Sequence, residues 1–240
     1  MMKIQQKLKK VLIITFFVIL VLYAVVFAYA YFNGRSGLRH NQTPDSGDIR
    51  VACVGDSITY GSQVSNWPQN HYPLLLNQLL GESYTVHNYG ISGATLLSSA
   101  DKPYIGTKIY PHSIAFEPDV VVIMLGTNDA KTNNWTNADD FRNQFSAFID
   151  VYLELPSKPE VFLCTPCKAY STGYSIQDER IEIAAQIIRE VAEGKGLQLI
   201  DIRLLSEQHP EWFEKDGIHP NNDGAAAIAQ EVYHILTKEN

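Results

Sequence analysis

The segment DVVVIMLGTND, residues 119–129, contains the clearest evidence for the fold class. Residues 120–125 (VVVIML) are an uninterrupted apolar run. Such a run is typical of a central strand in a parallel sheet, where both faces of the strand are buried. The polar GTND that follows would then lie at the carboxyl end of the strand, where α/β sheets place their functional loops.

The residues on either side of this strand repeat the same kind of pattern. Four more short strands are predicted, at residues 49–54, 84–88, 160–164 and 197–200. Helices with apolar residues at helical spacing are predicted at residues 72–80, 139–155, 176–193 and 222–236. Alternating strands and helices indicate an α/β fold with a five-stranded parallel sheet and helices on both faces.

Polar motifs follow three of these strands. They are GDSIT at 55–59, GISG at 90–93 and GTND at 126–129. A fourth motif, DGIHP at 216–220, comes just before the last predicted helix. Because the carboxyl ends of parallel strands share one edge of a sheet, we expect the four motifs to meet at one site.

Three of the motif residues have the chemistry of a nucleophile and its base. A serine hydroxyl reacts only slowly until a base takes its proton, and Ser57 is the candidate nucleophile. His219 is the candidate base, because imidazole titrates near neutral pH. Asp216 can accept a hydrogen bond from the other ring nitrogen, which would orient the ring and stabilise the imidazolium.

An attack by this serine on an ester carbonyl would create an oxyanion, which needs hydrogen-bond donors. The backbone N–H groups of Ser57 and Gly93 and the side-chain amide of Asn128 are the candidate donors. Taken singly, these residues are also typical of helix caps and tight turns. Their joint occurrence with His219 and Asp216 favours an active site.

In this order and spacing, the motifs resemble those of the SGNH, or GDSL-like, hydrolases. The resemblance extends from about Asp48 to Leu236, and it is closest for GDSIT, GTND and DGIHP. The first motif reads GDSI instead of GDSL, which leaves the nucleophile unchanged. The residues that give the family its name correspond to Ser57, Gly93, Asn128 and His219, and Asp216 corresponds to the third member of the triad. The family implies a flavodoxin-like three-layer α/β/α sandwich, no cofactor, and hydrolysis of esters or thioesters.

Wider segments are similar to one branch of that family. HNYGISGATL, VVVIMLGTNDAK and LPSKPEVFLCTPC resemble the members that act on acetylated carbohydrates. This resemblance implies removal of small O-acyl groups, above all acetyl, from carbohydrate. The N-terminal segment, described below, predicts that this carbohydrate lies outside the cytoplasm. The alternatives are a lysophospholipase or thioesterase acting on longer acyl chains, an acyltransferase, and a non-catalytic membrane-tethered module that binds glycans.

Aromatic side chains in the predicted loops are candidates for contact with a sugar substrate. Trp135, Trp67 and Tyr104 fall near the predicted site, and aromatic faces can stack on sugar rings. Packing inside a lid over the site is the alternative for the same residues.

The N-terminal segment predicts export. Residues 11–32 carry no charge, and this segment is long enough for a transmembrane helix, which needs about 20 residues. Lysines precede the segment, so the positive-inside rule places the remaining chain outside the cytoplasm. We expect a cytoplasmic basic stub and anchor over 1–32, a flexible tether over 33–47 and the hydrolase domain over 48–240. A signal peptide cleaved after Ala30 is the alternative.

Charge and cysteine content narrow the possible partners. The net charge is −7, and beyond the N-terminal lysines the chain carries 15 basic and 26 acidic side chains. This balance argues against a nucleic-acid partner, because phosphate binding needs basic patches. Cys164 and Cys167 form a lone CxxC without a second ligand pair, so no metal site is predicted. Whether these two cysteines form a local disulfide is left open by the sequence.

Overall fold

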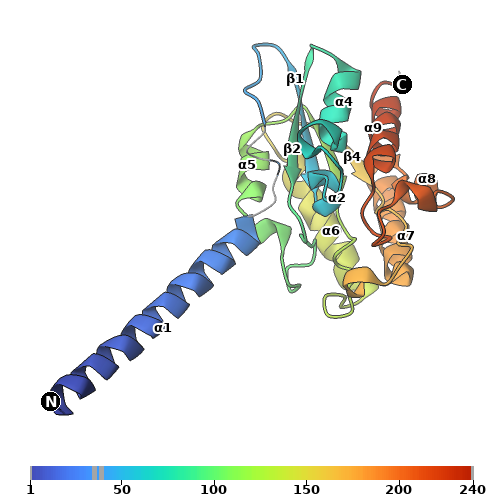
Figure 1. Ribbon diagram of the computed structural model, residues 1–240. Helices are drawn as coiled ribbons and strands as arrows, with labels where there is room; N and C mark the ends of the chain where they lie inside the picture. The colour runs from blue at the N-terminus through green and yellow to red at the C-terminus, as the bar shows by residue number, and fades with distance from the viewer. Residues whose placement is uncertain (1, 34–36, 38–40, 239–240) are drawn as a thin grey trace. The chain divides into compact units, whose positions relative to one another are not determined.

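The computed structural model of the protein describes residues 2–33, 37 and 41–238. Within the first range, it describes the side chains of residues 9, 10 and 12–26. The chain divides into two compact units, Met1–Gly34 and Arg35–Asn240. Both units are drawn in Figure 1.

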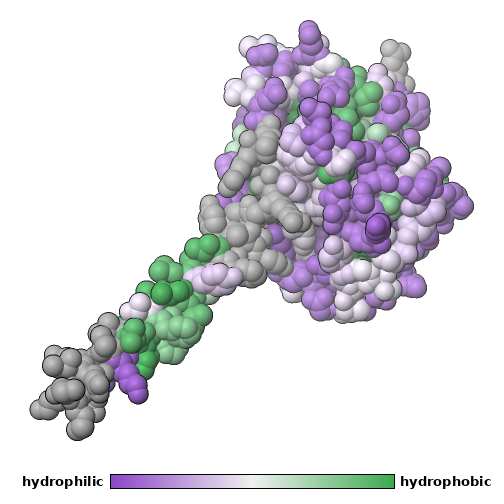
Figure 2. Space-filling model, in the orientation of Figure 1, coloured by the Kyte–Doolittle hydropathy of each residue, from purple (hydrophilic) through white to green (hydrophobic). Residues whose placement is uncertain are grey.

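The first unit contains one helix, α1 (Met2–Asn33). Its described apolar side chains are exposed, and Figure 2 shows hydrophobic residues gathered along it. In the described part of the chain, no helix is long and apolar enough to cross a membrane. The structure therefore does not support the transmembrane helix expected over residues 11–32. The side chains of Val11 and of residues 27–32, which belong to that prediction, are outside the described side chains.

The second unit is built on a five-stranded sheet, as predicted. All neighbouring strands are parallel, in the order β2-β1-β3-β4-β5. The strands are β1 (Ile49–Gly55), β2 (Tyr84–Gly90), β3 (Val120–Met124), β4 (Glu160–Cys164) and β5 (Gln198–Ile200). The apolar run at residues 120–125 forms the central strand β3, and its last four strand residues are buried.

Helices cover both faces of the sheet, which gives the predicted three-layer α/β/α arrangement (Figure 1). One face packs against α5 (Ile109–Ala115), α6 (Ala138–Leu153) and α7 (Asp178–Lys195). The other face packs against α4 (Tyr72–Leu80), α8 (Ile202–Ser206) and α9 (Asn222–Leu236). Because side chains alternate along a strand, Ala52 and Val54 join the first core and Val51 and Cys53 the second.

The long helices agree with the periodicity of the sequence, whereas several short ones were not predicted. α4 and α9 have the predicted bounds, and α6 and α7 begin and end within two residues of them. The unpredicted helices α2 (Ser57–Tyr60), α3 (Trp67–Asn70), α5 and α8 have four to seven residues each. A helix of one or two turns is too short to show an apolar periodicity.

The end of the predicted tether is bonded to the sheet. Asn41 accepts a hydrogen bond from the backbone N–H of Asn88 at 2.8 Å, and the Gln42 carbonyl lies 2.6 Å from Nε2 of His87. These contacts cover part of the outer edge of β2, an edge that would otherwise expose unpaired backbone groups. Residues 34–36 and 38–40 of the predicted tether lie outside the described residues, and the domain boundaries stay a prediction.

Candidate active site

Ser57 lies at the turn between β1 and α2. It is the first residue of α2 and is 5% exposed, and the Asp56 carboxylate caps the helix by accepting from the Ile58 N–H at 2.9 Å. The turn is tight at Gly55, where a Cβ atom would come within 2.6 Å of the Met124 carbonyl oxygen. A glycine is therefore needed for the strand to turn directly into the helix that carries the serine.

His219 connects this serine to Asp216. Nε2 of His219 lies 2.9 Å from Oγ of Ser57, and Nδ1 lies 2.7 Å from Oδ2 of Asp216. The sequence separation between the serine and the histidine is 162 residues, so only the fold brings them together. With the ring proton on Nδ1, the geometry allows Nε2 to take the serine proton.

The Asp216 carboxylate is held in its charged form. Its Oδ1 accepts the backbone N–H groups of Ile218 and His219, both at 2.9 Å. Partial burial acts to raise the pKa of Asp216, but these bonds and the His219 ring outweigh it and lower the pKa below its ordinary value. A negative charge therefore stays beside His219 and stabilises the imidazolium that forms when the ring is protonated.

The predicted oxyanion donors come from three elements. The Ser57 N–H is at the free N-terminus of α2, and the Gly93 N–H follows β2. Within the described part of the chain, neither N–H donates a hydrogen bond to another protein group. Gly93 has φ of +83°, a left-handed conformation that favours glycine. Both donors are thus available to a ligand.

Asn128, the third predicted donor, is already in contact with protein groups. Its Nδ2 lies 3.1 Å from the Ala94 carbonyl oxygen and 3.4 Å from Oδ2 of Asp56. The amide carries two protons, and the contact to Asp56 is at the long limit for a hydrogen bond. The proton on the side of Asp56, which has only this long contact, can therefore be shared with an oxyanion while the bond to Ala94 holds the side chain in place.

Two buried carboxylates support the same edge of the sheet. Asp129 accepts the backbone N–H groups of Leu96 and Leu97 at 2.9 and 2.7 Å, which fastens the loop after β2 to the loop after β3. Burial raises the pKa of Asp56 to about 6 and that of Asp129 to about 7. These contacts make them structural acceptors beside the Ser57–His219 pair.

One of the three aromatic candidates is wrong. Tyr104 is 0% exposed, and its hydroxyl donates to the Tyr89 carbonyl oxygen at 2.7 Å. Its ring also meets that of Phe148 at 5.8 Å between centroids, so it is part of the core and has no surface for a substrate. Its position in a loop did not reveal that the loop folds inward.

The two tryptophan candidates are partly exposed but packed on other aromatic rings. Trp67 stacks on Tyr60 at 5.0 Å, and its indole N–H donates to the Tyr60 carbonyl oxygen at 2.7 Å. Trp135 stacks on Phe141 at 5.6 Å. These contacts favour packing roles for both side chains, and a contact with substrate stays a prediction.

An aromatic residue that the sequence did not single out lies against the histidine. Tyr174 is 57% exposed, and its ring centroid is 5.6 Å from that of His219, with the rings nearly perpendicular. Tyr174 and Ser175 have φ values of +57° and +62°, which are uncommon for residues with a Cβ atom. The segment lies in a short 3₁₀ turn with no hydrophobic periodicity, so the sequence carried no signal for it.

Within the described residues, the three cysteines form no disulfide. Cys53, Cys164 and Cys167 are buried free thiols, so the local disulfide left open by the CxxC spacing is absent. Among the described residues, no group of three or more histidine, cysteine or acidic side chains could hold a metal ion.

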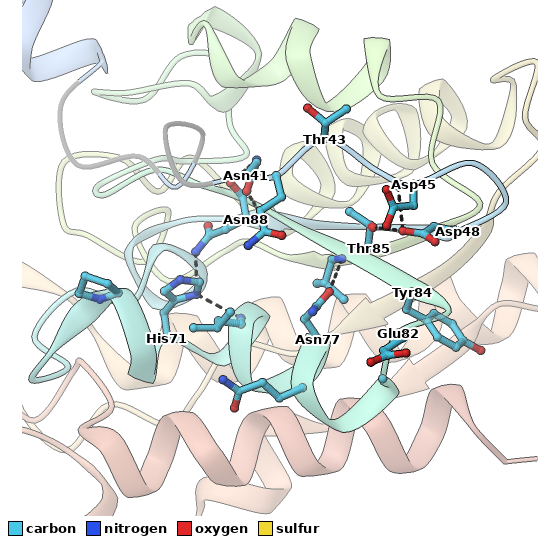
Figure 3. A pocket seen from close by; sticks show the side chains of 16 residues that line it. Asn41, Thr43, Asp45, Asp48, His71, Asn77, Glu82, Tyr84, Thr85 and Asn88 are labelled. Atoms are coloured by element: carbon cyan, nitrogen blue, oxygen red, sulfur yellow. Dashed lines mark hydrogen bonds between the residues drawn. The ribbon is translucent and has the colours of Figure 1, made fainter.

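A polar pocket lies away from this site. It has a volume of about 800 Å³ and is lined by residues from 41–48, α4 and β2 (Figure 3). Ser57, Asp216 and His219 are not among its lining residues. Asn77 and Asn88 in its wall bind backbone groups of β2, which accounts for part of its polarity.

Comparison with known proteins identifies the family. A family model described as the GDSL-like lipase/acylhydrolase family matches residues 53–227. An acetylxylan esterase of Xylanibacter ruminicola is 36% identical over 211 residues, which cover 80% of this chain; the chain spans 44% of that protein's length. An arylesterase of Vibrio mimicus is 26% identical over 198 residues, 79% of this chain and 88% of that protein.

A solved structure agrees with this result. The crystal structure of an acetyl xylan esterase matches with a TM-score of 0.61 and 26% identity, over 78% of this chain and 98% of that one. The residues matched by the family model include Ser57, Gly93, Asn128, Asp216 and His219. The chain therefore belongs to the GDSL-like lipase/acylhydrolase family of carboxylic ester hydrolases.

Proposed function

We propose that the protein removes small acyl groups, above all acetyl, from O-acetylated carbohydrate through an acyl-enzyme on Ser57. The observation that carries this proposal is the continuous chain of contacts from Ser57 Oγ through the His219 ring to Asp216, at 2.9 and 2.7 Å. Such a chain is the arrangement that activates a serine hydroxyl for attack on a carbonyl carbon.

The first half-reaction forms the acyl-enzyme. As Oγ of Ser57 attacks the acetyl carbonyl, its proton passes to Nε2 of His219. Asp216 stabilises the resulting imidazolium, and the N–H groups of Ser57 and Gly93 stabilise the oxyanion. When the tetrahedral intermediate collapses, the C–O bond to the sugar breaks and the imidazolium gives its proton to the leaving sugar oxygen.

The second half-reaction releases acetate. Water attacks the acyl carbonyl while His219 accepts one of its protons, and the same donors stabilise the second oxyanion. Collapse of this intermediate breaks the bond to Oγ of Ser57, which recovers its proton from His219. No external redox reagent or metal ion is needed for either step.

The substrate class is supported by the relatives and by Tyr174. An acetylxylan esterase and an acetyl xylan esterase structure are among the similar proteins. The exposed Tyr174 ring beside His219 would offer an apolar face or edge to a sugar ring that carries the acetyl group. Because an arylesterase is also among the relatives, the alcohol that is released from the ester could be of more than one kind.

The test measures acyl release by the full chain. Acetate release from acetylated xylan and hydrolysis of p-nitrophenyl esters of increasing acyl length are compared for wild type, Ser57→Ala and Ser98→Ala. Ser98 is exposed and is the matched control. We expect activity highest for acetyl, lost in Ser57→Ala and retained in Ser98→Ala. Activity that rises with chain length would support a lysophospholipase or thioesterase instead, and full activity of Ser57→Ala would disprove the acyl-enzyme.

We also propose that the domain acts outside the cytoplasm. The support is the lysine-rich N-terminus followed by an apolar segment, together with the polymeric carbohydrate that the function implies. In intact cells that express the full chain, a membrane-impermeant organophosphonate should label Ser57. Labelling that appears only after the cells are lysed would contradict this location.

A further inference from the structure

A buried lysine lies directly behind one of the predicted oxyanion donors. Lys102 is 2% exposed, and its Nζ donates to the Ser92 carbonyl oxygen at 2.9 Å. The aliphatic part of the side chain passes close to Gly93, since a Cβ atom built there would lie 3.7 Å from Cδ of Lys102. Burying an ammonium group is costly, so its placement here calls for a physical explanation.

The carbonyl that Lys102 binds belongs to the same peptide group as the Gly93 N–H. A peptide group is planar, so a bond that fixes the direction of the Ser92 C=O also fixes the direction of the Gly93 N–H. A charged donor on the oxygen also polarises the group, which makes the N–H on its other side a stronger donor. Both effects would favour binding of an oxyanion at Gly93.

The residue next to Lys102 connects to a second predicted donor. Oδ1 of Asp101 accepts from Nδ2 of Asn134 at 2.9 Å, and the same Nδ2 lies 2.9 Å from the Asn128 carbonyl oxygen. Oδ2 of Asp101 pairs with Lys131 at 3.2 Å. Two consecutive loop residues thus hold the backbone at Gly93 and at Asn128.

We propose that Lys102 is a positioning residue for the oxyanion hole, where its ammonium orients and polarises the Ser92–Gly93 peptide group. The proposal rests on the proposed function, because it assumes that the Gly93 N–H stabilises the oxyanion of ester hydrolysis. Lys102 acts through the peptide group and makes no contact with the substrate. Its effect therefore falls on the transition state, where the negative charge develops.

The charge on Lys102 also gives the proposal a pH signature. Burial lowers the pKa of Lys102 to about 8, while Asp101 acts to raise it and Lys131 to lower it. Within the described part of the chain, Asp101 and Lys131 are the charged side chains whose electrostatic effect on the ammonium is resolved. Below this pKa the ammonium is charged and polarises the peptide group. As the pH rises through it, the charge is lost and the Gly93 N–H becomes a weaker donor.

The test compares the full chain with Lys102→Met, which keeps most of the length of the apolar part of the side chain and removes the charge. Lys108→Met is the matched control, since Lys108 is an exposed lysine of the same segment. We expect about a tenfold lower kcat for acetyl ester hydrolysis in Lys102→Met, with KM unchanged, because loss of a whole oxyanion donor costs about a hundred- to thousandfold. Lys108→Met should match the wild type.

The pH profile separates positioning from a purely structural role. The kcat of the wild type should decline as the pH rises through about 8, and this decline should be absent in Lys102→Met. If Lys102→Met does not fold by circular dichroism, Lys102→Gln replaces it, with the same expectations of lower kcat and no decline. A variant with wild-type kcat, or with the wild-type decline, would overturn the proposal. A wild-type chain without esterase activity would instead overturn the proposed function.

Discussion

Two buried histidines in this protein lie in similar polar surroundings and differ in what they contact. His71 lies in the wall of the polar pocket between β2 and α4, and His219 lies at the carboxyl edge of the sheet (Figure 3). They are 6% and 8% exposed. Nδ1 of His71 accepts from the Leu74 N–H and lies within reach of the Asn88 amide, both at 3.2 Å.

The contacts of His71 are those of a helix cap, whereas those of His219 are those of a base. The neutral donors around Nδ1 of His71 hold the ring at the start of α4. His219 has a charged carboxylate on one nitrogen and a serine hydroxyl on the other. The two residues therefore have the same type and similar burial. Their chemical difference comes from the charged Asp216 carboxylate and the Ser57 hydroxyl, which only His219 contacts.

The most sensitive test of the difference between the two histidines is to remove each ring in turn. We expect His219→Ala to lower kcat by at least about 10⁴-fold, because the serine loses the group that takes its proton. His71→Ala should keep kcat unchanged. Steady-state hydrolysis of an acetyl ester measures both, and comparable losses in the two variants would contradict the distinction.

Replacing the charged partner tests the role of Asp216 alone. Asp216→Asn keeps the size of the side chain and removes its charge, so the imidazolium loses its stabilisation and the ring can adopt the wrong tautomer. We expect kcat to fall by about 10²- to 10⁴-fold with little change in stability. Single-turnover acylation rates give the measurement, and an unchanged rate would show that the carboxylate does not act on His219.

The acidic groups around the site predict an unusual pH dependence of stability. Burial raises the pKa of Asp56 and Asp129, so the folded state holds their protons more tightly than the unfolded state does. Their contribution to the free energy of unfolding is largest at low pH and is lost as the pH rises from about 4 to about 7.

Chemical denaturation across this pH range measures the effect. Asp129→Asn should flatten the fall in the free energy of unfolding, although it also weakens the hold on the Leu96 and Leu97 N–H groups. An equally steep fall in the wild type and in Asp129→Asn would rule out Asp129 as its source.

The smallest expected effect is the loss of stability in the His71→Ala variant. Loss of a helix cap destabilises a protein by about 1 kcal/mol, and His71→Ala also leaves the Asn88 amide without one contact. We expect a lower midpoint of thermal unfolding in this variant. An unchanged midpoint would show that the contacts of His71 add little to the stability of α4.

Much of the fold was predictable because it depends on local patterns. The central strand at 120–125 is apolar throughout, so its burial on both faces follows from composition. The bounds of α4 and α9 follow from apolar spacing that one helix by itself displays. The helices that were missed are too short for such a pattern, and α5 is the longest of them, with seven residues.

The candidate site was predictable only in part. The motifs of Ser57, Gly93, Asn128 and His219 each follow a strand or precede a helix, and parallel strands bring such ends together. Loop residues have no comparable rule. Tyr104 is folded into the core and Tyr174 beside His219, although both are tyrosines in loops.

The order of strands and helices along the chain, and the edge of the sheet where the polar motifs meet, followed from the amino-acid sequence. These features depend on periodicity and on the geometry of parallel sheets, which act over short stretches of chain. The tertiary structure alone decided which groups touch: that Lys102 binds the peptide group of Gly93, and that His219 and not His71 faces a serine. The first contact joins residues 10 positions apart and the second joins residues 162 apart, and in both cases only packing specifies the partner.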